Sequence, residues 1–202
     1  MLYTTIRIMI FFIIFIVLFV KIRRTKIVKK KLVTVLLLLF CVVFCSVSYF
    51  VPVENLFVNF KSPQDVFKYS CNGEIEDVVY GNNSCLIFSA DTHNIIPKTK
   101  TGYKIPIAFS MKTVGHKIDE TGSFNVYHVP DTDDYYIWGT TISIGSNIVV
   151  ADGNNSQLKI RLTPNDGTDY YTVLVYGLID NFTDEYYLLI NGEKTTIIGL
   201  NQ

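Results

Sequence analysis

The chain has 202 residues, which suits one ordinary domain with additional segments, and its 18 basic and 18 acidic residues give zero formal net charge. The charge is unevenly divided, because residues 1–53 carry eight basic residues and no acid, whereas the remainder carries ten basic and eighteen acidic residues. The net charge of −8 on the remainder argues against nucleic acid as a partner, since binding to phosphates needs a basic patch.

Two apolar stretches open the chain, at about 2–20 and 32–53. A helix rises about 1.5 Å per residue, so about 20 residues cross a hydrocarbon core of about 30 Å. The first stretch is only just long enough, and Arg7 near its start would have to extend to the headgroups. The sequence therefore predicts a transmembrane helical hairpin over residues 1–53.

A basic segment, residues 21–31, separates the two stretches. Short loops rich in Lys and Arg stay in the cytoplasm, so both termini are predicted to be extracytoplasmic. This interpretation predicts a two-span protein of the cell membrane, with the lipid bilayer and other membrane or envelope proteins as partners. The residues expected to set this topology are Lys21, Arg23, Arg24, Lys26, Lys29, Lys30 and Lys31.

A signal peptide is the alternative for the same region. Residues 21–48 also read as a basic segment, an apolar segment and small residues at Ser46 and Ser48. Cleavage after Ser48 would release the rest of the chain. The apolar span that precedes the basic segment favours an uncleaved anchor.

Residues 54–202 are predicted to form an extracytoplasmic β-rich domain with one short helix. Ser62 can cap that helix, Pro63 fits its first position, and Asp65 lies in its first turn. Short runs rich in β-branched and aromatic residues then predict strands. These runs are 77–80, 85–90, 104–109, 112–116, 124–129, 135–144, 148–151, 157–162, 171–178, 186–190 and 195–200.

Turn residues separate these strands, and Asn191-Gly192 predicts the clearest hairpin. The alternation of apolar and basic residues at 158–162 is typical of a strand with one wet face. Many short strands favour an antiparallel sandwich or a barrel-like sheet. Three segments, 134–136, 169–171 and 185–187, each run acid-Tyr-Tyr, which could supply an aromatic platform for a ligand but is more simply explained by similar strand starts.

Cys71 and Cys85 are the two cysteines beyond the apolar stretches, and in an oxidising compartment they could form a disulfide. Closing a loop of about 15 residues would stabilise the fold by roughly 3 kcal/mol. Two buried thiols are the alternative. The histidines, His93, His116 and His128, have no metal-ligand spacing and are interpreted as surface or hydrogen-bonded side chains.

Asp131, Asp133 and Asp134 form an acidic cluster whose oxygens could bind calcium. The Gly and the distant Glu of an EF-hand loop are missing, which favours a solvated turn. The sequence also has no Gly-x-Ser-x-Gly elbow, phosphate loop or dinucleotide fingerprint. We therefore expect no catalytic, metal-binding or cofactor-binding residue, and an enzyme is the less favoured interpretation.

Three segments, 60–70, 103–106 and 134–136, resemble a group of membrane-anchored proteins of Gram-positive bacteria whose function is not established. The resemblance covers roughly residues 54–140. It implies a small β-rich domain behind an apolar anchor at a bacterial cell membrane, and it implies no activity.

These observations favour a membrane-anchored, extracytoplasmic binding or interaction protein. One alternative is an accessory subunit of a membrane complex, because small polar residues such as Thr34, Ser46 and Ser48 could pack against partner helices. The other alternative is a cell-envelope hydrolase, which would require a histidine beside an acid or a cysteine in a cleft.

Overall fold

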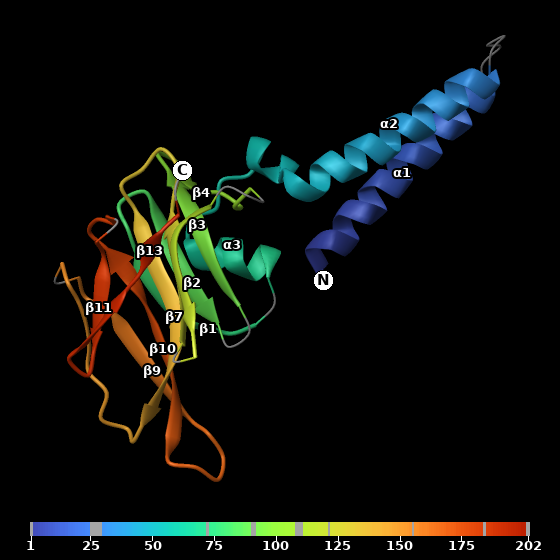
Figure 1. The fold of residues 1–202 in the computed structure, drawn as a ribbon. Coiled ribbons are helices and arrows are strands. Elements are labelled where there is room, and N and C mark those ends of the chain that lie inside the picture. The colour runs from blue at the N-terminus through green and yellow to red at the C-terminus, as the bar shows by residue number, and fades with distance from the viewer. Residues whose placement is uncertain are drawn as a thin grey trace.

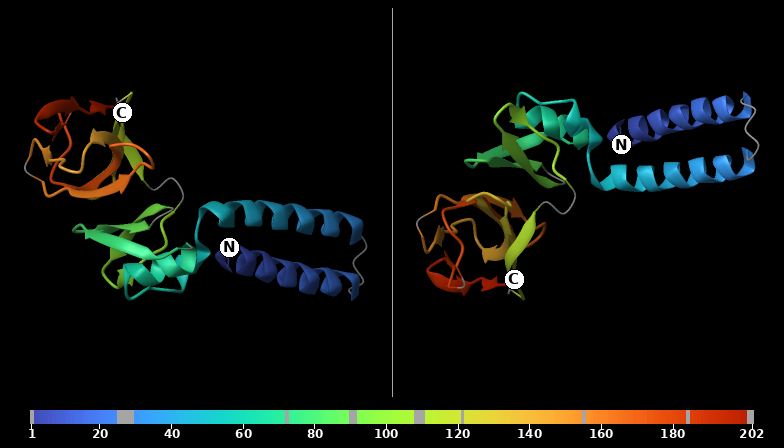
Figure 2. Two further views of the ribbon diagram at one scale, coloured as in Figure 1. Left: turned by 90° about the horizontal axis from the view of Figure 1, so that it is seen from below. Right: turned by 90° about the horizontal axis from the view of Figure 1, so that it is seen from above.

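The computed structural model of the chain describes residues 2–24, 30–71, 73–89, 92–107, 111–120, 122–154, 156–183 and 185–200. A hairpin of two long helices projects from a β-rich body (Figure 1). In the body, a short helix covers one sheet, and further sheets are stacked behind it (Figure 2).

The hairpin consists of α1 (Leu2–Arg24) and α2 (Lys30–Phe50), which lie side by side in both views of Figure 2. Phe11 and Phe44 join them through an edge-to-face ring contact with centroids 5.2 Å apart. Most of the apolar side chains described in the two helices are nevertheless exposed. The hairpin therefore keeps an extensive apolar surface.

Neither helix, over the residues described, has the length and apolar character that crossing a membrane requires. In α1 the uncharged run, residues 8–20, rises only about 20 Å, against about 30 Å of hydrocarbon. The predicted transmembrane helices at 2–20 and 32–53 are wrong, as is the two-span cell-membrane localisation with extracytoplasmic termini.

The β body begins after a 3-10 turn, η1 (Val53–Leu56), with helix α3 (Pro63–Ser70). The Asp65 N–H donates to Ser62 Oγ over 3.1 Å, so the predicted cap is confirmed. Val66 and Phe67 of α3 are fully buried against the first sheet. Its strands, in spatial order, are β1 (Ile75–Tyr80), β2 (Ser84–Ser89), β3 (His93–Thr99) and β4 (Gly102–Tyr103).

Two further antiparallel sheets complete the body. The six-stranded sheet has the spatial order β13 (Ile198–Gly199), β5 (Lys112–Asp119), β6 (Gly122–His128), β7 (Tyr135–Ile144), β10 (Tyr170–Ile179) and β9 (Lys159–Pro164). The three-stranded sheet has the order β12 (Glu193–Thr196), β11 (Tyr187–Ile190) and β8 (Val150–Asp152). The prediction of a mainly-β domain with one short helix after residue 53 is confirmed, and its strands form three antiparallel sheets with free edges.

Successive side chains of a strand point to opposite faces of its sheet, which explains how one strand contributes to two cores. In β2, Ile87 faces the core beneath α3, whereas Phe88 faces the core between the four- and six-stranded sheets. In β10, Tyr176 faces that same inter-sheet core, whereas Val175 faces the core shared with the three-stranded sheet. Each of the two larger sheets therefore contributes side chains from both of its faces to a core.

The predicted strands differ from the structure most at β3 and at residues 104–109, and the two-residue strand β4 was also not predicted. Strand β3 was not predicted, because Asn94 and Pro97 are residue types that strands usually lack. It nevertheless pairs with β2 from His93 to Pro97. The strand predicted at 104–109 is absent over residues 104–107, and residues 108–109 lie outside the described part. There the side chain of Asn55, rather than a neighbouring strand, bonds both backbone groups of Ile105.

Candidate binding groove

The free edges of all three sheets border one groove. β1, β9 and β8 are each the last strand of their sheet, with a paired neighbour on one side only. The groove has a volume of about 900 Å³ and is lined by residues 78–80, 150–152, 156–159, 178 and 180. Unpaired strand edges expose backbone donors and acceptors, so this place is suited to pairing with another chain.

The first half of the β1 edge is fastened to the six-stranded sheet by Asp77. Lys159 Nζ donates to the two carboxylate oxygens of Asp77 over 2.8 and 2.6 Å, and Tyr176 Oη donates over 2.9 Å. Burial alone would raise the pKa of Asp77, but these hydrogen bonds outweigh it and the pKa lies below its usual value. Asp77 is therefore a charged structural contact.

Glu76 and Arg161 form a second ion pair between the same two sheets. The guanidinium of Arg161 also lies 5.9 Å from the ring centroid of Phe88. The basic side chains of β9 therefore reach across to the acids of β1, where the sequence pattern had indicated a face turned to water. Both basic side chains remain nearly half exposed.

The second half of the β1 edge is open to the groove. The Gly81 N–H donates to the Ser84 carbonyl over 2.9 Å, which marks residues 81 and 84 as a hydrogen-bonded pair. Because such pairs alternate along antiparallel strands, the backbone groups of Val78 and Tyr80 point away from β2. The Val78 N–H is occupied by Asp77 Oδ1 at 2.8 Å, which leaves the Val78 carbonyl and the Tyr80 N–H on this edge.

Two further aspartates differ in what they can do at the groove. Asp152 is buried and fully engaged, because it accepts from the N–H groups of Asn154 and Ser156 and from Tyr186 Oη at 2.6 Å. Asp180 is exposed, and its carboxylate makes no hydrogen bond or ion pair with the described residues. Asp180 is thus the acid that can meet a positively charged ligand.

Cys71 and Cys85, which were considered as a possible disulfide, are both free thiols in this structure. Cys71 Sγ accepts from Asn94 Nδ2 at 3.1 Å, and Cys85 Sγ lies 3.8 Å from the Ile96 carbonyl. Burial raises the pKa of Cys85 to about 12. Two buried thiols were the alternative considered; Cys85 is buried, whereas Cys71 is half-buried.

The histidines are scattered. His93 stacks on Trp138 with centroids 4.3 Å apart, and burial lowers its pKa. His128 stacks on Tyr135, and His116 has a buried Nδ1 that makes no hydrogen bond with the described residues. Over the described part of the chain, no group of three or more His, Cys, Asp and Glu side chains is arranged to hold a metal ion.

The acidic cluster is divided in the structure. Asp131 and Asp133 are exposed, as expected for a solvated turn, but Asp134 is only 1 % exposed. Its carboxylate accepts from the N–H groups of Asn82 and Asn83 over 2.9 and 2.8 Å. The solvated-turn interpretation is therefore wrong for Asp134, whose carboxylate holds the β1–β2 turn.

The tyrosines of the acid-Tyr-Tyr segments lie in different surroundings. Tyr136 and Tyr186 are buried, and burial raises the pKa of each, whereas Tyr135, Tyr171 and Tyr187 are half-buried. Tyr170 is exposed at the start of β10, far along the strand from the groove. No aromatic platform is formed by the three segments as a group.

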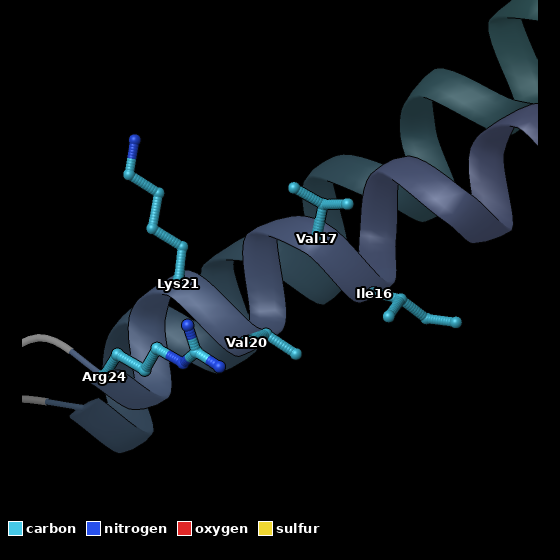
Figure 3. A pocket seen from close by; sticks show the side chains of 5 residues that line it. All are labelled: Ile16, Val17, Val20, Lys21 and Arg24. Atoms are coloured by element: carbon cyan, nitrogen blue, oxygen red, sulfur yellow. The ribbon is translucent and has the colours of Figure 1, made fainter.

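A separate hollow of about 420 Å³ lies on α1, where Ile16, Val17, Val20, Lys21 and Arg24 line it (Figure 3). Figure 3 shows these side chains projecting from successive turns near the end of the helix. Of the seven basic residues assigned to topology, Lys21, Arg23 and Arg24 end α1, Lys30 and Lys31 begin α2, and Lys26 and Lys29 lie outside the described residues.

Comparisons with protein-family models, with curated proteins and with solved structures return no match. The groove was not foreseen from the sequence. The sequence pattern that could have indicated it is the pair of acids Glu76-Asp77 opposite the bases of Lys159-x-Arg161, because opposite charges favour two strand edges that face each other.

Proposed function

We propose that this protein is a non-catalytic binding protein whose β body takes up an extended peptide segment in the groove. The observation that carries the proposal is the convergence of three free sheet edges on one groove. An added strand obtains affinity from backbone hydrogen bonds and specificity from its alternate side chains. The Val78 carbonyl and the Tyr80 N–H would supply one such pair of bonds.

The charge of the body indicates the class of peptide. Residues 54–202 carry a net charge of −8, and the carboxylate of Asp180 at the rim has no partner among the described residues. Val79, Leu158 and Leu178 offer apolar contacts along the same groove. We therefore infer a peptide that alternates basic and apolar residues.

Fluorescence polarisation with a labelled heptapeptide that alternates lysine and valine tests this proposal. We expect wild-type protein to bind the probe, and Tyr80→Pro to weaken binding by about tenfold, because it removes the groove-facing N–H without breaking the β1–β2 ladder. Thr196→Pro is the matched control, since Thr196 has the same outward orientation on the remote edge strand β12. No binding to wild type, or equal loss in both variants, would overturn the proposal.

A second interaction is favoured by the hollow on α1. Lys21 and Arg24 stand beside Ile16, Val17 and Val20, so cationic and apolar groups share one helix face (Figure 3). We propose that this face contacts anionic lipid, through phosphate at the cations and acyl chains at the apolar residues.

Vesicle flotation separates this proposal from a protein partner for the hairpin. We expect the protein to float with phosphatidylglycerol vesicles, and Lys21→Gln with Arg24→Gln to weaken that flotation. The matched control is Lys98→Gln with Lys100→Gln, which removes the same charge from the exposed end of the β3–β4 region. Flotation that is unaffected by the α1 substitutions would contradict the assignment.

The hydrolase alternative is not favoured. It required a histidine beside an acid or a cysteine, and the ring contacts of His93 and His128 are with aromatic side chains. The accessory-subunit alternative predicts instead that a second protein co-purifies with this one in mild detergent.

A further inference from the structure

A second cavity lies between the four-stranded sheet and the turn after β6, apart from the groove. Its volume is about 390 Å³, within the range of pockets that bind small molecules. The walls are mainly apolar, and the buried residues Ile95, Ile105 and Val129 form their inner part. A ligand with an apolar body would therefore fit these walls.

Lys104 supplies a positive charge to this cavity. Its Nζ donates to the carbonyl oxygens of Asn55 at 2.5 Å and Val58 at 2.9 Å. An ammonium has three donors, so one remains, and no acidic side chain of the described residues pairs with Lys104. The two carbonyls thus hold the cation in place without neutralising it.

Asp131 supplies a negative charge to the same cavity. Its backbone has φ 62°, in the left-handed region that non-glycine residues rarely occupy. The carboxylate makes no hydrogen bond or ion pair with the described residues. Strained residues of this kind persist where the surrounding structure holds them, often at ligand sites.

We propose that this cavity binds a small apolar zwitterion, of the class of a free branched-chain α-amino acid. Its carboxylate would meet Lys104, its ammonium would meet Asp131, and its side chain would lie against the apolar walls. Each charged group of the ligand then neutralises a charge that the protein leaves unpaired. This site shares no lining residue with the groove, so it stands independently of the peptide-binding proposal.

Titration calorimetry on the full-length wild-type protein provides the test, with L-leucine as the probe. The comparison ligands are 4-methylpentanoate, which lacks the ammonium, and 3-methylbutylamine, which lacks the carboxylate. We expect each to bind about tenfold more weakly than leucine, because each loses one charge-assisted contact. Equal binding of all three ligands, or no binding of leucine at millimolar concentration, would overturn the proposal.

Variants locate the site. Lys104→Met keeps the apolar stem, and Asp131→Asn keeps a side chain that tolerates the left-handed backbone. Each is expected to weaken leucine binding by about tenfold, whereas the exposed controls Lys98→Met and Asp133→Asn leave it unchanged. If Lys104→Met does not fold, Asp131→Asn and the comparison ligands still test whether leucine binds in this cavity. Leucine binding that is unaffected by Asp131→Asn would contradict the site.

Discussion

Ser84 Oγ donates a hydrogen bond of 2.6 Å to Asp134 Oδ2, although the two residues are 50 positions apart in the sequence. Ser84 begins β2 and Asp134 immediately precedes β7, so this bond connects the four-stranded sheet to the six-stranded sheet. Tyr136 Oη lies 3.0 Å from the same Ser84 oxygen. The β1–β2 turn is thereby fixed against the second layer.

Replacing Asp134 by Ala should destabilise the protein substantially. The backbone N–H groups of Asn82 and Asn83 and the hydroxyl of Ser84 would lose their acceptor. A buried donor without a partner costs about 1–3 kcal/mol, so we expect a loss of at least about 2 kcal/mol in the free energy of unfolding. Urea denaturation measures this loss, and the exposed neighbour Asp133→Ala should remain within about 0.5 kcal/mol of wild type.

The sequence indicates local features well and long-range partners poorly. Asn191-Gly192 predicts a turn, and the structure has φ 52° and φ 85° at these residues between β11 and β12. The cap at Ser62 is equally local. By contrast, nothing in the run Asp131 to Asp134 distinguishes the acid that turns inwards, because its three donors come from a segment 50 residues earlier.

The same limit applies to the candidate sites. Composition correctly separates a basic, apolar N-terminal part from an acidic β-rich part. Lys104 and Asp131, however, come together only because β4 and the turn after β6 pack at one end of two stacked sheets. Stacking order is not encoded in strand periodicity, since a strand buried on both faces gives no alternation to read.

Cys85 should resist alkylation in the folded protein. Burial raises the pKa of its thiol to about 12, so almost none is thiolate near neutral pH. Cys71 is only half-buried and should react with iodoacetamide first. Peptide mass spectrometry after timed labelling tests the order, with a urea-unfolded sample as the control in which both react; faster labelling of Cys85 than of Cys71 in native protein would contradict it.

His93 should make stability depend on pH below its ordinary pKa of about 6.5. Burial lowers the pKa of the folded state, so the unfolded chain binds the proton more readily. The contribution of His93 is complete above about pH 6.5 and is lost as pH falls through the folded-state pKa.

The free energy of unfolding at pH 7.5 and pH 5.5, for wild type and His93→Gln, measures this contribution. We expect the wild-type loss on acidification to exceed that of the variant. His128→Gln is the control for the removal of a histidine that also stacks on an aromatic ring but lies outside the contacts of His93. An equal pH slope in wild type and His93→Gln would show that His93 does not carry the effect.

The Asp77–Lys159 pair should contribute modestly and in a salt-dependent way. Its atoms are 2.6 Å apart, but the Lys159 side chain is 47 % exposed, so solvent screens much of the attraction. A double-mutant cycle with Asp77→Asn and Lys159→Gln should give a coupling energy of about 0.5–1 kcal/mol at low salt. At about 1 M salt the Debye length falls to about 3 Å, and the coupling should shrink towards zero. Tyr176→Phe removes a neighbouring hydrogen bond to Asp77 without removing charge, so its cost should change little with salt. A coupling energy that is constant across this salt range would mean that geometry, rather than charge, holds β1 to β9 beside the groove.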